Sequence, residues 1–330
     1  MASGGFGSMI EKLKQNPKKI VFTEGTDPRI LEAASRLLAG NFLHPVLVGK
    51  EDEILKASEE AGYNIRGAEM YDPEHFDRMD EMVGQFCELR KSKGVTKEQA
   101  REILKGANYF GTMLVKMGIA DALLGGATYS TADTVRPALQ LIKTKPGNKI
   151  VSSCFILVRP TGLGEDEVLA MGDCAICIDP TEDELVEIAR ETAECATHFG
   201  IEPRIGFLSY STKGSGAGED VDKMRNAVKK TIEQHPELRV LEAEVQFDAA
   251  VSPKVAETKF PGNEIAGHCN TFIFPDINAG NIGYKIAQRL GGFDAYGPIL
   301  LGLNAPINDL SRGCNGQEVY SMAIVTAALA

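Results

Sequence analysis

The chain has 330 residues, and its 35 lysines and arginines against 46 aspartates and glutamates give a formal net charge of −11 at pH 7. That acidic balance argues against a general nucleic-acid-binding protein, which would carry a basic surface, so an anionic substrate would have to be held by a local cationic pocket. A chain this long exceeds one ordinary hydrophobic core and suggests two domains.

The cysteine pattern and the absence of long apolar runs indicate a reduced, non-membrane compartment. Seven scattered cysteines predict free thiols in a cytoplasmic protein, and Cys174 with Cys177 forms a lone CxxC for which we expect plain packing. No window approaches the ~20 apolar residues of a membrane helix. Residues 1–8 lack the features of a secretion signal and are expected to form a flexible tail.

The first part of the chain alternates strands and helices. A strand over 19–25 precedes a helix for which Asp27 and Pro28 supply an N-cap and a first-turn proline. Further along we expect a strand over 45–49, a helix over 51–61, a mostly helical stretch over 73–118 broken near Gly94 and Gly106, a strand over 122–126 and a helix over 131–144 limited by Pro137. This alternation predicts a parallel sheet covered on both faces.

Turn residues over 145–150 introduce a second α/β unit. Strands over 150–158 and 174–178 could pair antiparallel, and a capping box from Thr181 to Glu184 opens a helix that Gly200 closes. Strands over 204–209, 239–245 and 270–274 then alternate with helices near 220–235 and 281–290.

The C-terminal region carries the densest group of reactive side chains. An apolar run over 299–303 predicts a buried strand, which Gly302, Asn304 and Pro306 end. A polar loop follows, and then a helix that begins near Glu318. Strand, polar loop and helix build a site at the carboxyl edge of an open α/β sheet. The loop carries Asn308, Asp309, Ser311, Arg312 and Cys314.

Three other segments could help to bind an anion. Ser130 and Thr131 lead into a predicted helix N-terminus, where free N–H groups and the helix dipole favour negative charge, and Arg136 lies further along that helix. Arg90 belongs to a charged run. Lys213 precedes the glycine-rich residues 214–218, which could form a backbone anion nest. An ordinary surface or loop role is the alternative for each.

Several common chemistries lack a motif. No Walker-type phosphate loop is present, and the five histidines lie apart, without the spacing of a nucleophile motif or a metal site. Cys314 has no histidine nearby in sequence, so a buried thiol is favoured over an acyl-carrying nucleophile. The residues therefore indicate a site for an anionic acyl donor, without a metal or a tightly bound cofactor.

Five sequence blocks resemble the phosphate acetyltransferase (phosphotransacetylase) family, and sister phosphate butyryltransferases share much of the pattern. The resemblance runs from about residue 9 to the C-terminus. It implies the reaction acetyl-CoA plus phosphate to acetyl phosphate plus CoA, and its reverse, by direct attack of the CoA thiolate in a ternary complex. CoA would be a substrate, and the enzyme a homodimer. The blocks are 108–118, 125–137, 207–216, 274–284 and 304–314.

The same resemblance implies a domain organisation. The expected fold is the two-domain α/β architecture of isocitrate and isopropylmalate dehydrogenases, with the active site in an interdomain cleft. Domain I would comprise 1–148 and 298–330, and domain II 149–297. This division places the strand over 299–303 in domain I.

Site roles follow by motif position. Ser311 would hydrogen-bond the reacting thiol or thiolate, and Arg312 would hold the phosphate and stabilise the tetrahedral oxyanion. Arg90 and Arg136 match family arginines that bind CoA and phosphate, and Cys314 matches a cysteine that is not the acyl carrier.

Two residues are candidates for the general base. Glu318 stands where the family commonly has the aspartate proposed to deprotonate CoA, and its extra methylene changes the reach of the carboxylate. Asp309 is the nearest substitute, so the assignment stays open between the two.

Three alternative functions remain. One is transfer of butyryl or another short acyl group. A decarboxylating 2-hydroxy-acid dehydrogenase on the same fold would need a carboxylate cluster for a divalent metal and a nicotinamide site, neither of which is identifiable. An inactive sensor of CoA or acyl phosphate is disfavoured by the intact Ser311–Arg312 pair.

Overall fold

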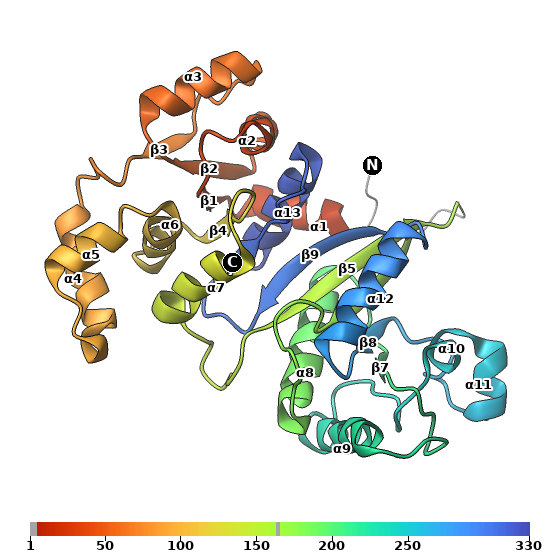
Figure 1. The fold of residues 1–330 in the computed structure, drawn as a ribbon. Helices are drawn as coiled ribbons and strands as arrows, with labels where there is room; N and C mark the ends of the chain where they lie inside the picture. The colour runs from red at the N-terminus through yellow and green to blue at the C-terminus, as the bar shows by residue number, and fades with distance from the viewer. Residues whose placement is uncertain (1–4, 163–165) are drawn as a thin grey trace. The chain divides into compact units, whose positions relative to one another are not determined.

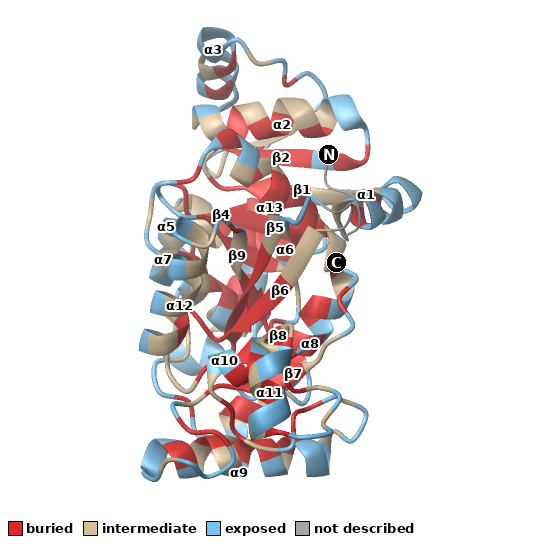
Figure 2. Cartoon of the chain, turned by 90° about the vertical axis from the view of Figure 1, so that its right-hand side faces the viewer, coloured by how far each residue is buried: buried red, intermediate tan, exposed pale blue. Residues whose placement is uncertain are grey.

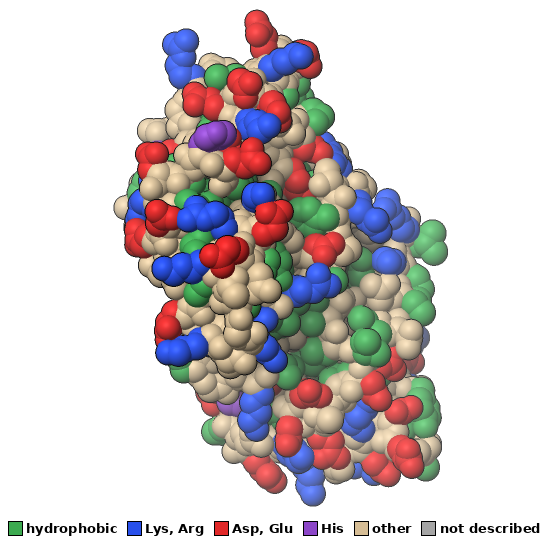
Figure 3. Space-filling view, turned by 60° about the vertical axis from the view of Figure 1, so that its left-hand side comes forward, with side chains coloured by type: hydrophobic (Ala, Val, Ile, Leu, Met, Phe, Trp, Pro, Cys, Tyr) green, Lys and Arg blue, Asp and Glu red, His purple; other side chains and the backbone are tan. Residues whose placement is uncertain are grey.

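The computed structural model describes residues 5–162 and 166–330, which fall into two compact α/β units (Figure 1). The first unit comprises Phe6–Pro146 and Leu303–Ala330, and Gly147–Gly302 form the bulk of the second unit. Within the described ranges, none of the helices combines the length and apolar character that a bilayer crossing requires. On the face drawn in Figure 3, acidic side chains lie among the basic ones.

The first unit is built on a parallel sheet, as predicted. Its strand order is β10-β4-β1-β2-β3, and all the pairings are parallel. The strands are β1 (Lys18–Phe22), β2 (Leu43–Val48), β3 (Glu69–Tyr71), β4 (Ala122–Gly125) and β10 (Ile307–Asp309). The last three residues of β1, 20–22, are fully buried, as expected for a strand covered on both faces (Figure 2).

Helices of the first unit begin where the sequence supplies caps. Asp27 caps α2 by accepting the N–H of Arg29 at 2.9 Å, and Pro28 occupies the first turn. The last helix, α13, is buried over most of its length and packs against α2 and β4. The helices are α1 (Gly5–Gln15), α2 (Pro28–Gly40), α3 (Glu51–Ala61), α4 (Met79–Leu89), α5 (Lys97–Ile103), α6 (Ala107–Lys116), α7 (Thr131–Pro137) and α13 (Gly316–Ala328), with the 3-10 helix η1 (Lys91–Lys93) and the π-helix η2 (Ala138–Ile142).

The second unit contains a mixed sheet in the order β7-β8-β6-β5-β9. β5 pairs antiparallel with β6 and β9, whereas β8 pairs parallel with β6 and β7. The predicted capping box of Thr181 and Glu184 forms at the start of α8. The elements are β5 (Ser152–Pro160), β6 (Asp166–Gly172), α8 (Glu182–His198), β7 (Ile205–Phe207), α9 (Glu219–Gln234), α10 (Phe247–Val251), α11 (Pro253–Lys259), β8 (Thr271–Ile273), α12 (Ile277–Arg289) and β9 (Asp294–Leu301).

Two strand predictions in this unit were wrong. The strand that pairs with β5 is Asp166–Gly172, not 174–178. Residues 174–178 form a turn because the buried carboxylate of Asp173 accepts the N–H groups of Ala175 and Ile176, at 2.7 and 3.0 Å, which withdraws them from a sheet. The stretch 239–245 contributes only isolated bridges at Val240 and Val245.

The placement of the strand over 299–303 in domain I was also wrong. It is the end of β9, where Leu301 pairs with Ser152 and Ile299 with Cys154 in the second sheet. The chain enters the first unit only at Leu303, and the three-residue β10 completes that sheet beside β4.

Asn308 and Asp309, expected in a loop, therefore lie on a buried strand. Their polar side chains mimic loop composition, yet each finds a hydroxyl partner inside the unit: Asn308 donates to Thr326 at 2.9 Å, and Asp309 accepts from Thr131 at 2.6 Å.

Candidate functional site

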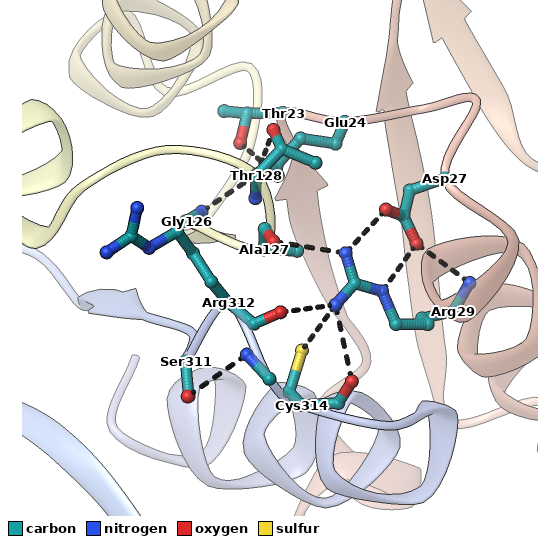
Figure 4. Close-up of polar contacts among 11 residues, drawn as sticks. Thr23, Glu24, Asp27, Arg29, Gly126, Ala127, Thr128, Ser311, Arg312 and Cys314 are labelled. Atoms are coloured by element: carbon teal, nitrogen blue, oxygen red, sulfur yellow. Dashed lines mark hydrogen bonds and ion pairs between the residues drawn. The ribbon is translucent and has the colours of Figure 1, made fainter.

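The candidate site lies at the carboxyl edge of the first sheet. The neighbouring strands β10, β4 and β1 run parallel, so the turns that follow them meet at one edge. We call these the β1 turn (23–27), the β4 turn (126–130) and the β10 turn (310–315). Figure 4 shows the polar contacts that join them.

Glu24 of the β1 turn is bonded to the β4 turn. One carboxylate oxygen accepts the N–H groups of Gly126 and Thr128, both at 3.1 Å, and the other accepts the Thr23 hydroxyl at 2.8 Å. Burial raises the pKa of Glu24, and these hydrogen bonds act in the opposite direction. Two N–H groups of the β4 turn are thus already bonded to the protein's own carboxylate.

Asp309 connects β10 to α7. Its two oxygens accept the hydroxyl groups of Thr131 and Thr134, each at 2.6 Å, and its side chain is buried. Burial raises the pKa of Asp309. Gly126 has φ +98°, and a Cβ there would lie 2.2 Å from an Asp309 oxygen, so only glycine allows this approach. The predicted binding residue Thr131 therefore directs its hydroxyl toward Asp309.

The β10 turn presents Ser311 and Arg312 at the surface. The Ser311 hydroxyl accepts the Gly313 N–H at 3.3 Å, and the Ser311 carbonyl accepts the Cys314 N–H at 2.9 Å. Within the described ranges, the Arg312 guanidinium has no hydrogen-bond or ion-pair partner, and Figure 4 shows it extending away from Arg29 and Cys314. An unpaired, exposed guanidinium is a group that a phosphate binds well.

Cys314 is the buried cysteine of this turn. Its Sγ lies 3.7 Å from Nη1 of Arg29. Burial raises the pKa of the Cys314 thiol to about 11, although the Arg29 guanidinium acts to lower it. A thiol with that pKa stays protonated near neutral pH and is a weak nucleophile.

Glu318 is the third residue of a capping box on α13. Its carboxylate accepts the Asn315 N–H at 2.9 Å, while the Asn315 side chain accepts the Glu318 N–H at 2.9 Å. One carboxylate oxygen is therefore engaged in capping the N-terminus of the helix, and the side chain is half-exposed. No hydrogen bond in the described part of the chain joins Glu318 to Ser311.

Asp133 pairs with two of the predicted binding residues. The Ser130 hydroxyl donates to it at 2.7 Å, and Nη1 of Arg136 lies 3.4 Å from it. Arg136 is exposed, so this is a weak surface ion pair, and a phosphate could replace Asp133 as the partner of the guanidinium. Arg90 caps the end of α4, and no hydrogen bond or ion pair among the described residues joins it to the three turns.

Lys213 belongs to the second unit, where its predicted nest is already filled. The Lys213 ammonium lies 3.1 Å from Glu242, and the buried carboxylate of Glu244 accepts the Gly214 N–H at 2.7 Å. Any anion here would have to displace an internal carboxylate. Among the described residues, no three His, Cys, Asp or Glu side chains are grouped so as to hold a metal ion.

Sequence reasoning missed Glu24 and Arg29, although both contact the predicted segments. Arg29 carried a usable signal, because a cation in the first turn of a helix opposes the helix dipole and needs a compensating partner. Asp27 is that partner, at 2.7 Å, and it raises the pKa of Arg29 above its ordinary value.

Comparison with known proteins bears on the whole chain. The family model for phosphate acetyl/butaryl transferase matches residues 6–327. The chain is 52% identical over 325 residues to the phosphate acetyltransferase of Bacillus subtilis (strain 168), covering 98% of both sequences. A phosphotransacetylase structure from Streptococcus pyogenes is 49% identical with a TM-score of 0.92, over 98% of this chain and 97% of that one.

A more distant structure shares the fold alone. A dehydrogenase-like protein from Salmonella typhimurium is 13% identical with a TM-score of 0.52, covering 96% of this chain and 100% of that one. The predicted α/β fold class is thereby confirmed. Because the family model and the curated relative both span nearly the entire sequence, the chain belongs to the phosphate acetyl/butaryl transferase family.

Proposed function

We propose that this chain is a phosphate acetyltransferase, which transfers an acetyl group reversibly between CoA and phosphate. The proposal rests on 52% identity to a curated phosphate acetyltransferase over 98% of both sequences. The structural observation that carries it is the β10 turn, where a guanidinium without a partner among the described residues stands beside a hydroxyl group. CoA acts as a substrate, and the acetyl donor is an anion.

Arg312 holds the phosphate of acetyl phosphate. A guanidinium can donate two parallel hydrogen bonds to phosphate oxygens, which fixes the orientation of the donor as well as its position. When the CoA thiolate attacks the acetyl carbon, negative charge develops on the carbonyl oxygen, and a nearby fixed cation stabilises that charge. The C–O bond to phosphate then breaks, and phosphate leaves with the electron pair.

Ser311 orients the attacking sulfur. Its oxygen accepts the Gly313 N–H, which holds the side chain and leaves the hydroxyl hydrogen for a thiolate. Further contacts to the substrates come from Arg136, Ser130 and Arg90. Each lies at or near the surface of the first unit, where a substrate can reach it.

Glu318 is the better candidate for the base that deprotonates CoA. Both oxygens of Asp309 accept threonine hydroxyls inside the unit, and that side chain is only 2% exposed. Glu318 uses one oxygen for its helix cap and is half-exposed, so its second oxygen is accessible. On the family resemblance, we also propose a cytoplasmic homodimer that works without a metal or a tightly bound cofactor.

One assay tests the function. Purified protein is given free CoA with acetyl, propionyl or butyryl phosphate, and the thioester formed is measured at equal protein concentration. We expect the acetyl donor to react fastest. Faster turnover of the butyryl donor would assign the sister activity, and the absence of thioester from all three donors would refute acyl transfer. A parallel assay with NAD(P), Mg²⁺ and a 2-hydroxy acid tests the dehydrogenase alternative.

A further inference from the structure

Arg29 is the most highly connected side chain beneath the candidate site. Its Nε and Nη2 donate to the two carboxylate oxygens of Asp27 at 2.9 and 2.7 Å. Nη2 also donates to the carbonyl of Ala127 at 3.0 Å. Nη1 donates to the carbonyls of Arg312 and Cys314 at 2.9 and 3.3 Å. Figure 4 shows the guanidinium lying between Asp27 and these three carbonyls.

These contacts use the full donor capacity of the group. A guanidinium has five N–H bonds in one plane, and here each has an acceptor. Arg29 therefore has no donor left for a substrate phosphate unless it releases the protein. Arg312 is in the opposite condition, because its guanidinium has no partner within the described ranges. The two arginines are thus divided in function: one is satisfied internally, and the other is presented outward.

The acceptors of Arg29 belong to the segments that the proposed site needs. The Arg312 carbonyl is the backbone of the phosphate-binding residue itself, and the Cys314 carbonyl lies at the end of the same turn. The Ala127 carbonyl is in the β4 turn. Asp27 caps α2 and holds the guanidinium through two hydrogen bonds, so the anchor is a regular helix instead of a loop.

We propose that Arg29, held by Asp27, is a positioning residue for acyl transfer: it fixes the backbone of the β10 turn against the β4 turn so that the Arg312 guanidinium meets the phosphate. This inference rests on the proposed role of Arg312. Lysine cannot replace Arg29, because a single ammonium cannot reach acceptors on both sides of a planar fork. Small displacements of a substrate-holding group can cost about 100-fold in rate.

The main competing explanation is that Arg29 only stabilises the fold, and Arg36 supplies the matched control. Arg36 lies on the same helix, donates to Gln317 of α13 at 2.8 Å, and stacks over Tyr320 at 4.0 Å. It therefore also joins α2 to the C-terminal segment, but among the described residues no hydrogen bond or ion pair joins it to the β10 turn. Arg29→Lys and Arg36→Lys each keep the positive charge and remove the planar donor group.

The first measurement compares these variants by steady-state kinetics and thermal unfolding. We expect Arg29→Lys to lower kcat by about 10- to 100-fold, while the KM for CoA changes by less than about threefold. Asp27→Asn keeps the N-cap but loses one acceptor for Arg29, so it should show the same pattern to a smaller degree. Arg36→Lys should keep kcat within about threefold at a comparable melting temperature. A kcat near that of the parent chain in Arg29→Lys would overturn the proposal.

The second measurement is a double-mutant cycle with Arg312→Ala. If Arg29 acts through Arg312, then Arg29→Lys should lower kcat/KM by less than about threefold once Arg312 has been removed. A purely structural effect would reduce activity by the same factor in both backgrounds, and that result would refute positioning. If Arg312→Ala alone retained full activity, the proposed phosphate site would fail instead, so the two failures are distinguishable.

Discussion

The β10 turn and the loop after Lys213 have similar sequence features and opposite electrostatic conditions. Both combine a cation with glycine and serine, and both are candidates for anion binding. At Lys213 the ammonium is paired with Glu242 at 3.1 Å, and Glu244 occupies the Gly214 N–H. At Arg312 the guanidinium is exposed and has no partner in the part of the chain that the structure describes.

The difference shows that a sequence motif suited to anion binding can bind a substrate only if no carboxylate of the protein already occupies its donor groups. Glu244 is 30 residues from Gly214 in sequence, so nothing local reveals that it accepts that N–H. The β4 turn is an intermediate case. The Glu24 carboxylate accepts the N–H groups of Gly126 and Thr128, while Ser130 at the end of the turn remains exposed.

The largest expected effect tests this contrast directly. Arg312→Ala should lower kcat/KM for acetyl phosphate by about 100- to 1,000-fold, the usual cost of losing a preorganised group that stabilises transition-state charge. Lys213→Ala removes a cation that is already paired and should change kcat/KM by less than about threefold. Steady-state kinetics on both variants measure the ratio, and similar losses would break the comparison.

Glu318→Gln should have an intermediate effect. A thiol with a pKa of ~8.5 needs roughly 2 kcal/mol to ionise at pH 7, so a base can supply at most about a 30-fold acceleration. Glutamine still completes the capping box, and the melting temperature should stay unchanged. The same rate assay measures the loss. A loss as large as that of Arg312→Ala would mean that the base matters more than the cation.

The smallest expected effect is on stability and concerns Asp309, whose two carboxylate oxygens already accept hydrogen bonds. Burial raises its pKa above the ordinary value, so the native state binds the proton more tightly than the unfolded state does. The stability contributed by this group is present at low pH and is lost as pH rises through the native pKa. The parent chain should therefore gain free energy of unfolding relative to Asp309→Asn as pH falls from 7 toward about 4.

Urea unfolding of both proteins at pH 7 and pH 5 measures this difference. The titrating groups that the two proteins share cancel in the comparison. If the parent chain instead lost free energy of unfolding relative to Asp309→Asn between pH 7 and pH 5, its threonine hydrogen bonds would outweigh desolvation.

Local chemistry accounts for what could be predicted of the fold. The N-cap at Asp27 with Pro28, and the capping box of Thr181 and Glu184, are contacts within one helical turn, so both were readable from sequence. The family was predictable because long blocks such as 304–314 identify it. The predicted interdomain cleft and the roles of the site residues stay predictions.

Hydrogen bonds and strand pairings between distant segments could not be predicted from the sequence. Asn308 and Asp309 were predicted to lie in a loop, because the threonines that accept or donate their hydrogen bonds belong to the distant helices α13 and α7. The end of β9 was assigned to the wrong sheet, because an apolar run does not indicate which strand it will pair with.

Sequence alone determined the family, the α/β character and the residues of the β10 turn, because these depend on residue identity and near-neighbour spacing. Only the tertiary structure decided which charged groups are satisfied and which are presented. A hydrogen bond such as Arg29 to the Arg312 carbonyl joins residues 283 positions apart, and that proximity exists only once the parallel strands have brought their carboxyl ends to one edge.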